Sequence, residues 1–241
     1  MPLPTISAPT YELELPSTSE TIKYRPFLVR EEKLLVLALE SEDPKQITTA
    51  IKTVITNCIQ TEGINVEKLP TFDIEYLFLN IRGKSVGEEI EVNVLCPDDE
   101  QTYVPVKINI DEIQVKKNSD HSKNIKIDDK VAMEMGYPSL DQFIKNNFDF
   151  SDTVGIEQSF ELIATCIEQI FTEEESWVVR DVPKKEVMNF LEQMNSSQFK
   201  QIEKFFETMP KLSHEVPVKN PSTGVKSTVL LEGLSLSLIH I

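Results

Sequence analysis

The stretch IKYRPFLVREEKLLVLALE, Ile22 to Glu40, decides the fold of the first half of the chain. A β-type segment ends at Arg25-Pro26, and a polar turn leads directly into a helix that is apolar on nearly every side. A helix of that kind has to be buried by other elements. We therefore expect a packed protein that covers this helix.

The elements on both sides of this stretch have clear signals. Residues 11–15 alternate apolar side chains with glutamates, and a Ser-Thr-Ser turn leads into residues 21–24, which predicts a β-hairpin. Asp43-Pro44 offers a helix cap followed by proline at the first helical position. Apolar residues then recur at helical spacing from Ile47 to Ile59 and predict an amphipathic helix.

A third helix and a second hairpin follow. The segment after Thr71 predicts a helix that is capped by Thr71 and ends near Gly83. After Gly87 the period becomes alternating, over Ile90–Val94 and again over Val104–Ile110. A Pro-containing turn separates the two runs, so the pair predicts a β-hairpin with one buried face.

The second half is expected to be helical. Residues 116–123 are polar and predict a mobile loop or linker. Two short helices are expected at Val131–Met135 and from Leu140 to Ile144. Three longer apolar stripes at helical spacing, ending in the Met-Pro of residues 209–210, predict a small antiparallel bundle. The stripes span residues 160–171, 187–194 and 199–209.

Two segments of the chain repeat a similar order of residues, and we call this repeat the echo. The segment His214–Pro221 repeats the order of Ile90–Pro97, because both are alternating strands that end in a Pro turn. A second strand follows each turn and ends similarly, at Ile110–Ile113 and Leu231–Leu234. We therefore expect two related hairpins. Each offers a strand ribbon or an exposed edge that can pair with a neighbouring subunit.

The bulk composition excludes several function classes. A chain of 241 residues with 40% apolar content can bury a hydrophobic core that needs no disulfide bonds for stability. The three scattered cysteines fit a reducing cytoplasm. A net charge of −16 disfavours nucleic acid as a partner. The N-terminus lacks a signal-peptide pattern, and no run approaches the length of a membrane span. We interpret Cys58 and Cys166 as core thiols.

No catalytic constellation is visible. The histidines are His121 in a polar loop, His214 at a strand entrance and His240 at the C-terminus, and none lies in a recognisable motif. Gly83 and Gly87 are the only close glycine pair, which disfavours a phosphate-binding loop. We therefore expect no catalytic residue, no cofactor-binding residue and no enzyme activity.

Two residue sets leave alternatives open. The carboxylate runs could bind divalent cations or supply acid and base groups, although such runs are more often solvated turns and helix ends. Trp177 is expected to close a helix before Arg180, either as an interface anchor or as a half-buried core residue. The carboxylate runs are Asp98-Asp99-Glu100, Asp128-Asp129 and Glu173-Glu174-Glu175.

The order of several blocks resembles the baseplate hub assembly proteins of T-even-like contractile-tailed bacteriophages. The blocks are Tyr24–Phe27 with Glu31-Glu32-Lys33 and the Leu-rich helix, then 71–83, 196–212 and 231–234. This resemblance implies a virion-assembly role and partners among hub or tail proteins, with no enzymatic activity. It also implies Cys-x-x-Cys pairs in the hairpin turns, a spacing suited to zinc.

The zinc pattern is nearly erased here. Cys96 stands at a knuckle position, but Asn220 occupies the matching place in the second hairpin. His214 could reach Cys96 only through a special fold, and one thiolate cannot build a structural zinc site. We therefore expect no metal. The last residues, 236–241, are identical to one reading frame of a transposon mosaic-end sequencing adapter, so we interpret 235–241 as a non-native tail.

These observations predict an α+β fold that is mainly helical, with an N-terminal β-hairpin and two further, degenerate zinc-ribbon-like hairpins after helical segments. The expected division is a hairpin arm (1–30), helices with the first hairpin (31–115), a linker with short helices (116–150), a bundle with the second hairpin (151–234) and the tail (235–241). The predicted function is a non-enzymatic factor of the phage baseplate hub. Alternatives are an acidic protein that inhibits a host protein and a carboxylate-based hydrolase.

Overall fold

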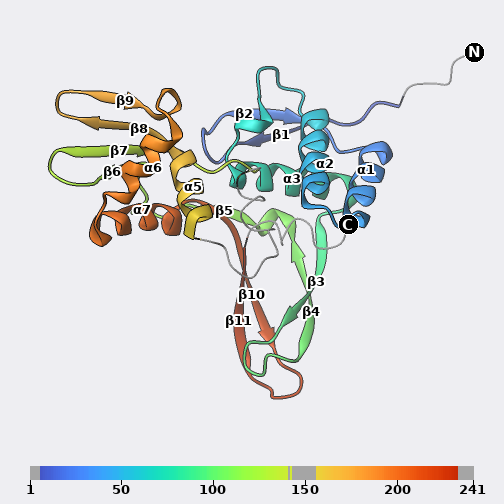
Figure 1. The fold of residues 1–241 in the computed structure, drawn as a ribbon. Coiled ribbons are helices and arrows are strands. Elements are labelled where there is room, and N and C mark those ends of the chain that lie inside the picture. The colour runs from blue at the N-terminus through green and yellow to red at the C-terminus, as the bar shows by residue number, and fades with distance from the viewer. Residues whose placement is uncertain (1–5, 141, 143–155, 233–241) are drawn as a thin grey trace, which may run out of the picture. The chain divides into compact units, whose positions relative to one another are not determined.

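The computed structural model describes residues 6–140, 142 and 156–232. The chain forms two compact units, which we call unit 1 (Met1–Lys116 with Lys211–Ile241) and unit 2 (Lys117–Pro210). Figure 1 labels their elements. The domain boundaries expected from the sequence alone stay a prediction, as does the origin of residues 235–241, which lie outside the described residues.

Unit 1 combines helices with three small antiparallel sheets. Its helices are α1 (Val29–Glu40), α2 (Pro44–Cys58) and α3 (Thr71–Val86), with short 3-10 turns at Val66–Lys68 and Ile110–Glu112. Its strands are β1 (Tyr11–Glu14), β2 (Thr21–Tyr24), β3 (Glu89–Leu95), β4 (Tyr103–Asn109), β5 (Gln114–Lys116), β10 (Lys211–Lys219) and β11 (Lys226–Glu232). The sheet orders are β1-β2, β3-β4 and β11-β10-β5.

Helix α3 is buried on most of its sides and forms the centre of unit 1. Leu77, Phe78 and Ile81 are all fully inaccessible to solvent. Its expected boundaries are wrong at both ends, because Pro70 is the N-cap and the helix continues to Val86. Gly83 lies inside the helix, where a β-carbon would come within 3.3 Å of the Ile110 side chain. The glycine therefore serves close packing rather than helix termination.

The turn before α1 is fixed by a buried ion pair. Glu31 accepts hydrogen bonds from the Arg25 guanidinium at 3.1 Å, from Arg30 at 2.8 Å and from the Leu28 amide at 2.8 Å. Burial raises the pKa of Glu31, but the hydrogen bonds from Arg30 and Arg25 outweigh it and lower the pKa to about 2. The charged Glu31 thus holds the segment before α1 against the start of that helix.

The expectation that α1 is covered on nearly every side is wrong. Leu35 and Ala38 are buried, at 3% and 6% exposure, but Leu34, Val36 and Leu37 remain 37%, 39% and 54% exposed. The short chain between α1 and α2 lets only one side of α1 pack against its neighbour, so an apolar strip stays in contact with water.

Unit 2 is built on a four-stranded antiparallel sheet in the order β6-β7-β8-β9. Its strands are β6 (Asn124–Lys126), β7 (Val131–Met135), β8 (Ile167–Thr172) and β9 (Ser176–Val178). Its helices are α5 (Ile156–Cys166), α6 (Lys184–Glu192) and α7 (Ser196–Thr208), with a 3-10 turn at Val179–Asp181. Side chains from the sheet and from these helices share one hydrophobic core.

Three expectations for unit 2 are therefore wrong. Val131–Met135 is a strand, and the predicted long helix changes at Ile167 into β8. The helices share their core with a sheet instead of forming an antiparallel bundle. A run of isoleucine and phenylalanine satisfies either period, and here β7 and β9 pair with β8 on both sides. The expected helix from Leu140 to Ile144 lies mostly outside the described residues.

The chain is α+β, but it is not mainly helical with hairpins only. Four antiparallel sheets, two of them with more than two strands, stand beside the helices in the described residues. The N-terminal hairpin is confirmed, with Leu13 opposite Ile22. The two later hairpins are also present, as β3-β4 and β10-β11.

Candidate interaction surfaces

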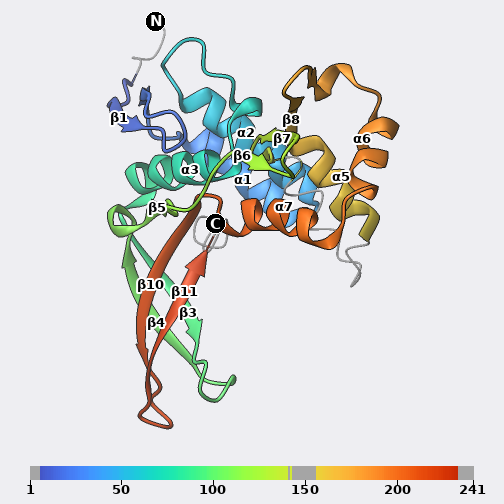
Figure 2. The ribbon, with the colours of Figure 1, turned by 90° about the vertical axis from the view of Figure 1, so that its left-hand side faces the viewer.

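The hairpins β3-β4 and β10-β11 lie side by side and extend together from the rest of unit 1, as both ribbon views show (Figures 1 and 2). We call them the paired hairpins. Their strands come from positions more than 100 residues apart in the chain, so their association is a purely tertiary contact.

The alternation of each strand places one apolar row between the hairpins. In the first hairpin Val92 lies opposite Val106, and in the second Val216 lies opposite Val229. Both rows belong to one hydrophobic cluster, in which Val92 and Val216 are 3% and 1% exposed. The buried members from the two hairpins are Ile90, Val92, Val94, Ile108, Leu212, Val216 and Val218.

The two turns share one backbone design. The Glu100 amide donates to the Cys96 carbonyl at 3.0 Å, and the Gly224 amide donates to the Asn220 carbonyl at 2.8 Å. Glu100 and Gly224 both have left-handed backbones, with φ of 53° and 77°. Cys96 and Asn220 therefore occupy equivalent positions, as the sequence echo predicts.

Asp98 joins the two tips. Both of its carboxylate oxygens accept from the Asn220 side-chain amide at 3.1 Å, and one also accepts from the Thr223 hydroxyl. Asn220 is 1% exposed. The hydrogen bonds from Thr223 and Asn220 lower the pKa of Asp98. We call Asp98, Asn220 and Thr223 the tip clasp, because they hold together two turns that are 122 residues apart.

The neighbouring acidic residue Asp99 is used within its own turn. It accepts from the Gln101 and Thr102 amides at 3.1 and 3.0 Å and from the Thr102 hydroxyl at 2.6 Å. These hydrogen bonds, the Thr102 hydroxyl first, hold its pKa well below the usual range. A general acid needs a raised carboxyl pKa, so this arrangement supports turn structure rather than proton transfer.

Within the described residues Cys96 does not belong to a group of side chains that could bind a metal. Its thiol is buried, and burial followed by the charges of Asp98 and Asp99 raises its pKa. His214 is on β10, where it lies opposite Leu231 of β11. It precedes Asn220 by six residues, which is roughly 20 Å along an extended strand. Among the described residues no group of three histidine, cysteine or acidic side chains could hold a metal ion.

The other two cysteines are free and buried. Burial raises the pKa of Cys58 to about 11 and that of Cys166 to about 12. Both thiols therefore stay protonated near neutral pH and pack as apolar groups, in agreement with their interpretation as core residues.

His121 has a structural role. Its Nδ1 lies 3.0 Å from the Thr208 hydroxyl and its Nε2 lies 3.0 Å from the Tyr137 hydroxyl. Burial and then the nearby charge of Lys123 lower its pKa. Residues 117–123 form neither helix nor strand and follow directly on unit 1, so the expected loop or linker is present, and its mobility stays a prediction; His121 fastens it to α7.

Trp177 and the last two carboxylate runs belong to unit 2. Trp177 belongs to the strand β9, opposite Ile170, and not to a helix end, and it is 41% exposed. Asp128 accepts from two amides of its own turn, and Asp129 forms an exposed ion pair with Lys126. Residues 173–175 lie in the β8-β9 turn, and His240 lies outside the described residues.

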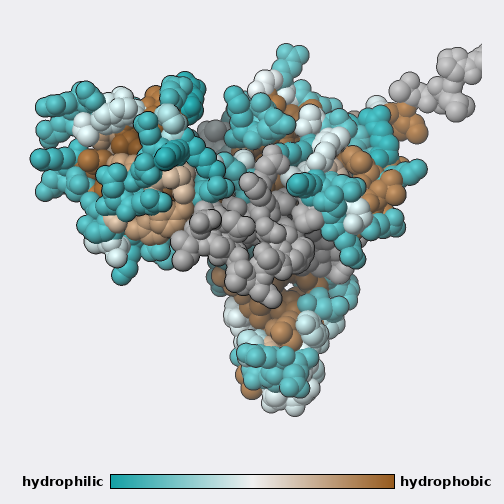
Figure 3. Space-filling view, viewed as in Figure 1, coloured by the Kyte–Doolittle hydropathy of each residue, from teal (hydrophilic) through white to brown (hydrophobic). Residues whose placement is uncertain are grey.

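Exposed apolar side chains mark the paired hairpins as a candidate contact surface. Tyr103 and Leu230 are 62% and 50% exposed, and Val225 and Leu95 add 46% and 36%. Figure 3 shows apolar surface among the polar residues of this region. Within the described residues β11 pairs only with β10, so the other edge of residues 226–231 has no strand partner there. Apolar side chains beside a free edge favour binding of another chain.

The sequence analysis missed the role of Asp98 and the exposed strip of α1. The matching Pro turns in the sequence indicate that the two tips are related. The spacing of residues along the chain does not show that Asn220 is the partner of Asp98. In the part of the chain that the structure describes, no helix has both the length and the apolarity to span a bilayer.

Comparison with known families places these features in context. The family model described as T4 bacteriophage base plate protein matches residues 8–236, which is nearly the whole chain. No curated protein and no solved structure gives a significant match. Because the match spans both hairpins and all the described helices, the chain belongs to the family of T4 bacteriophage base plate proteins.

Proposed function

We propose that this protein is a non-enzymatic component or assembly factor of the baseplate hub, which binds other hub or tail proteins through the paired hairpins. The observation that carries this proposal is the pairing itself. Two distant segments form one projecting surface with exposed Tyr103 and Leu230, and among the described strands the outer edge of β11 at residues 226–231 has no partner. Such a surface suits β-strand addition by a neighbouring subunit.

The side chains of the acidic tip agree with a non-catalytic role. Asp98 and Asp99 accept hydrogen bonds from fixed donors and have lowered pKa values, so they remain ionised near neutral pH. A cell-wall zymogram tests this part directly. Clear lytic activity that disappears in Asp98→Asn or Asp99→Asn would contradict the proposal.

The binding role is tested by co-expression with baseplate hub proteins, followed by size exclusion. We expect a stable complex that Leu230→Asp and Tyr103→Asp weaken. Val86→Asp is a matched control, because Val86 is 63% exposed at the end of α3, outside the hairpins. Persistent failure to form a complex, or capture of a host enzyme instead of virion proteins, would count against a hub role.

A gene deletion tests the role in the virion. We expect intact heads and tails that lack complete baseplates, since the protein acts in the host cytoplasm during assembly and then at the tail baseplate. Normal baseplates in the deletion strain would contradict the proposal.

A further inference from the structure

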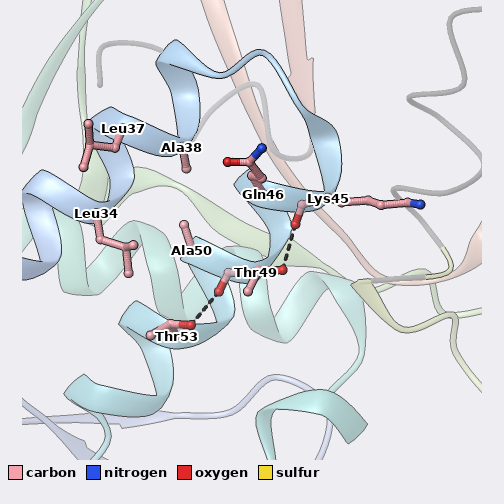
Figure 4. Close-up of a pocket in the computed structure, with 8 residues that line it drawn as sticks. All are labelled: Leu34, Leu37, Ala38, Lys45, Gln46, Thr49, Ala50 and Thr53. Carbon is pink, nitrogen blue, oxygen red and sulfur yellow. Dashed lines mark hydrogen bonds between the residues drawn. The ribbon is translucent and has the colours of Figure 1, made fainter.

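A groove lies between α1 and α2 in unit 1, away from the paired hairpins in the chain. Its volume is about 340 Å³. Figure 4 shows Leu34 and Leu37 of α1 on one side and Thr49 and Thr53 of α2 on the other. Leu37 is 54% exposed, and Figure 3 shows apolar surface over α1. We call this feature the α1-α2 groove.

The floor of the groove consists of small residues. Ala38 and Ala50 lie at its base and are only 6% and 3% exposed. Three residues connect α1 to α2, so the two helices form an antiparallel hairpin. A groove between two such helices with alanines at its floor has the shape that receives a ridge of larger side chains from a third helix.

The backbone chemistry of the groove selects a helix over a strand. Both walls are helices, whose main-chain groups bond within each helix and leave no edge for an extended chain. The wall hydroxyls are used as well, because Thr49 donates to the Lys45 carbonyl at 2.8 Å and Thr53 donates to the Thr49 carbonyl at 2.7 Å. An occupant must therefore satisfy its own backbone groups, which an α-helix does and a single strand does not.

The charges beside the groove indicate the flanks of that helix. Lys45 lines the groove, and Lys33 lies four residues before Leu37, on the same face of α1. Neither lysine forms a salt bridge within the described residues, although the chain carries 40 acidic against 24 basic residues. Each lysine is near the start of its helix, so the two mark opposite ends of the groove. Glu40, Glu42 and Asp43 precede Lys45 closely in the chain, and the charge of Lys45 already acts on Asp43, so Lys33 is the cation that offers the attraction.

We propose that the α1-α2 groove binds an amphipathic helix of another baseplate protein. That helix carries an apolar stripe at i, i+3, i+4 and i+7 and an acidic residue at the end that meets Lys33. The inference rests on the proposed function, since it takes the partner from the same assembly. It adds a second contact site and a different mode of binding from the strand addition at the paired hairpins.

Photo-cross-linking in infected cells tests the occupant. The full-length protein carries p-benzoylphenylalanine in place of Leu37, or in place of Val86 as the control, and the adducts are identified by mass spectrometry. We expect an adduct at position 37 with another tail protein, in a peptide that has the apolar stripe and an acidic residue at one end of it. No adduct at position 37, an adduct with a second copy of this chain, or an adduct with a peptide that lacks the stripe overturns the inference.

Substitution in the purified complex separates this inference from the proposed function. Leu37→Asp should weaken the complex at least ~10-fold, because it places a charge in an apolar contact, while Val86→Asp should not. Equal urea midpoints of both variants and the wild type would show that they fold. A complex that is unchanged by Leu37→Asp overturns the groove and leaves the hub role standing. Failure of the wild type to form any complex would overturn the hub role. The presence or absence of the adduct at position 37 then tests binding at the groove by itself.

Discussion

The two hairpins of unit 1 share a backbone and differ in the side chains at their tips. In both turns a backbone amide donates to the carbonyl four residues earlier, and the donating residue has a left-handed backbone. The first tip supplies an acceptor, Asp98, and the second supplies the donors Asn220 and Thr223. The pairing is therefore complementary rather than symmetric. This difference shows how two hairpins of one design can recognise each other, through an apolar row along the strands and a polar contact at the ends.

The largest expected effect comes from the shared apolar row. Val92 and Val216 are equivalent in the echo, and each loses two buried methyl groups in an Ala variant. We expect each substitution to lower the free energy of unfolding by about 2 kcal/mol, and the pair by about 4 kcal/mol. Urea denaturation measures this, with the exposed Thr228→Ala as a control near zero. A cost at only one of the two valines would show that the hairpins do not share a core.

The clasp is tested at the equivalent positions Asn220 and Cys96. Asn220→Ala removes the donor to Asp98 and leaves turn amides without their acceptor, so it should lower the free energy of unfolding by about 1–3 kcal/mol. Cys96→Ala removes only a buried sulfur and should cost about 1 kcal/mol. Equal costs in denaturant unfolding would mean that the two tips contribute in the same way, against the asymmetry described above.

The turns differ in backbone strain. Gly224 has φ of 77° and open space around its α-carbon, so Gly224→Ala should cost about 1 kcal/mol from conformation alone. Glu100 holds the equivalent left-handed position with a β-carbon, so Glu100→Gly should not destabilise the protein. Thermal unfolding of both variants checks that only Gly224→Ala lowers the melting temperature. A destabilised Glu100→Gly variant would indicate that the Glu100 side chain has a role beyond the turn.

The smallest effect is the pH dependence of the clasp. The pKa of Asp98 is lowered from 3.8 by the hydrogen bonds of Thr223 and then Asn220. A lowered folded-state pKa means that this stabilisation is present above the ordinary carboxyl pKa and is lost as the pH falls through the lowered value. As the pH falls below the ordinary carboxyl pKa, the wild type should lose more stability than Asp98→Asn. Parallel loss in both proteins would show that Asp98 does not contribute.

The candidate surfaces could be predicted only in part. The echo of residues 90–97 in 214–221 correctly predicted two matched hairpins, whereas the expectation that Cys96 binds no zinc stays a prediction. The link from Asp98 to Asn220 was not predictable, because a hydrogen bond across 122 residues has no local signature. The exposed strip of α1 was missed because apolarity on all sides was taken to require burial on all sides.

The sequence by itself determined the local periods of this protein: the alternation of its hairpins, the cap at Asp43 and the helical spacing of α2, α6 and α7. Tertiary structure decided which period the run from Ile167 to Thr172 would follow and which face of α1 would be covered. The physical reason is that a side-chain period states only which face is apolar. Whether that face meets a sheet, a helix or a partner protein depends on which distant backbone groups and side chains are brought against it.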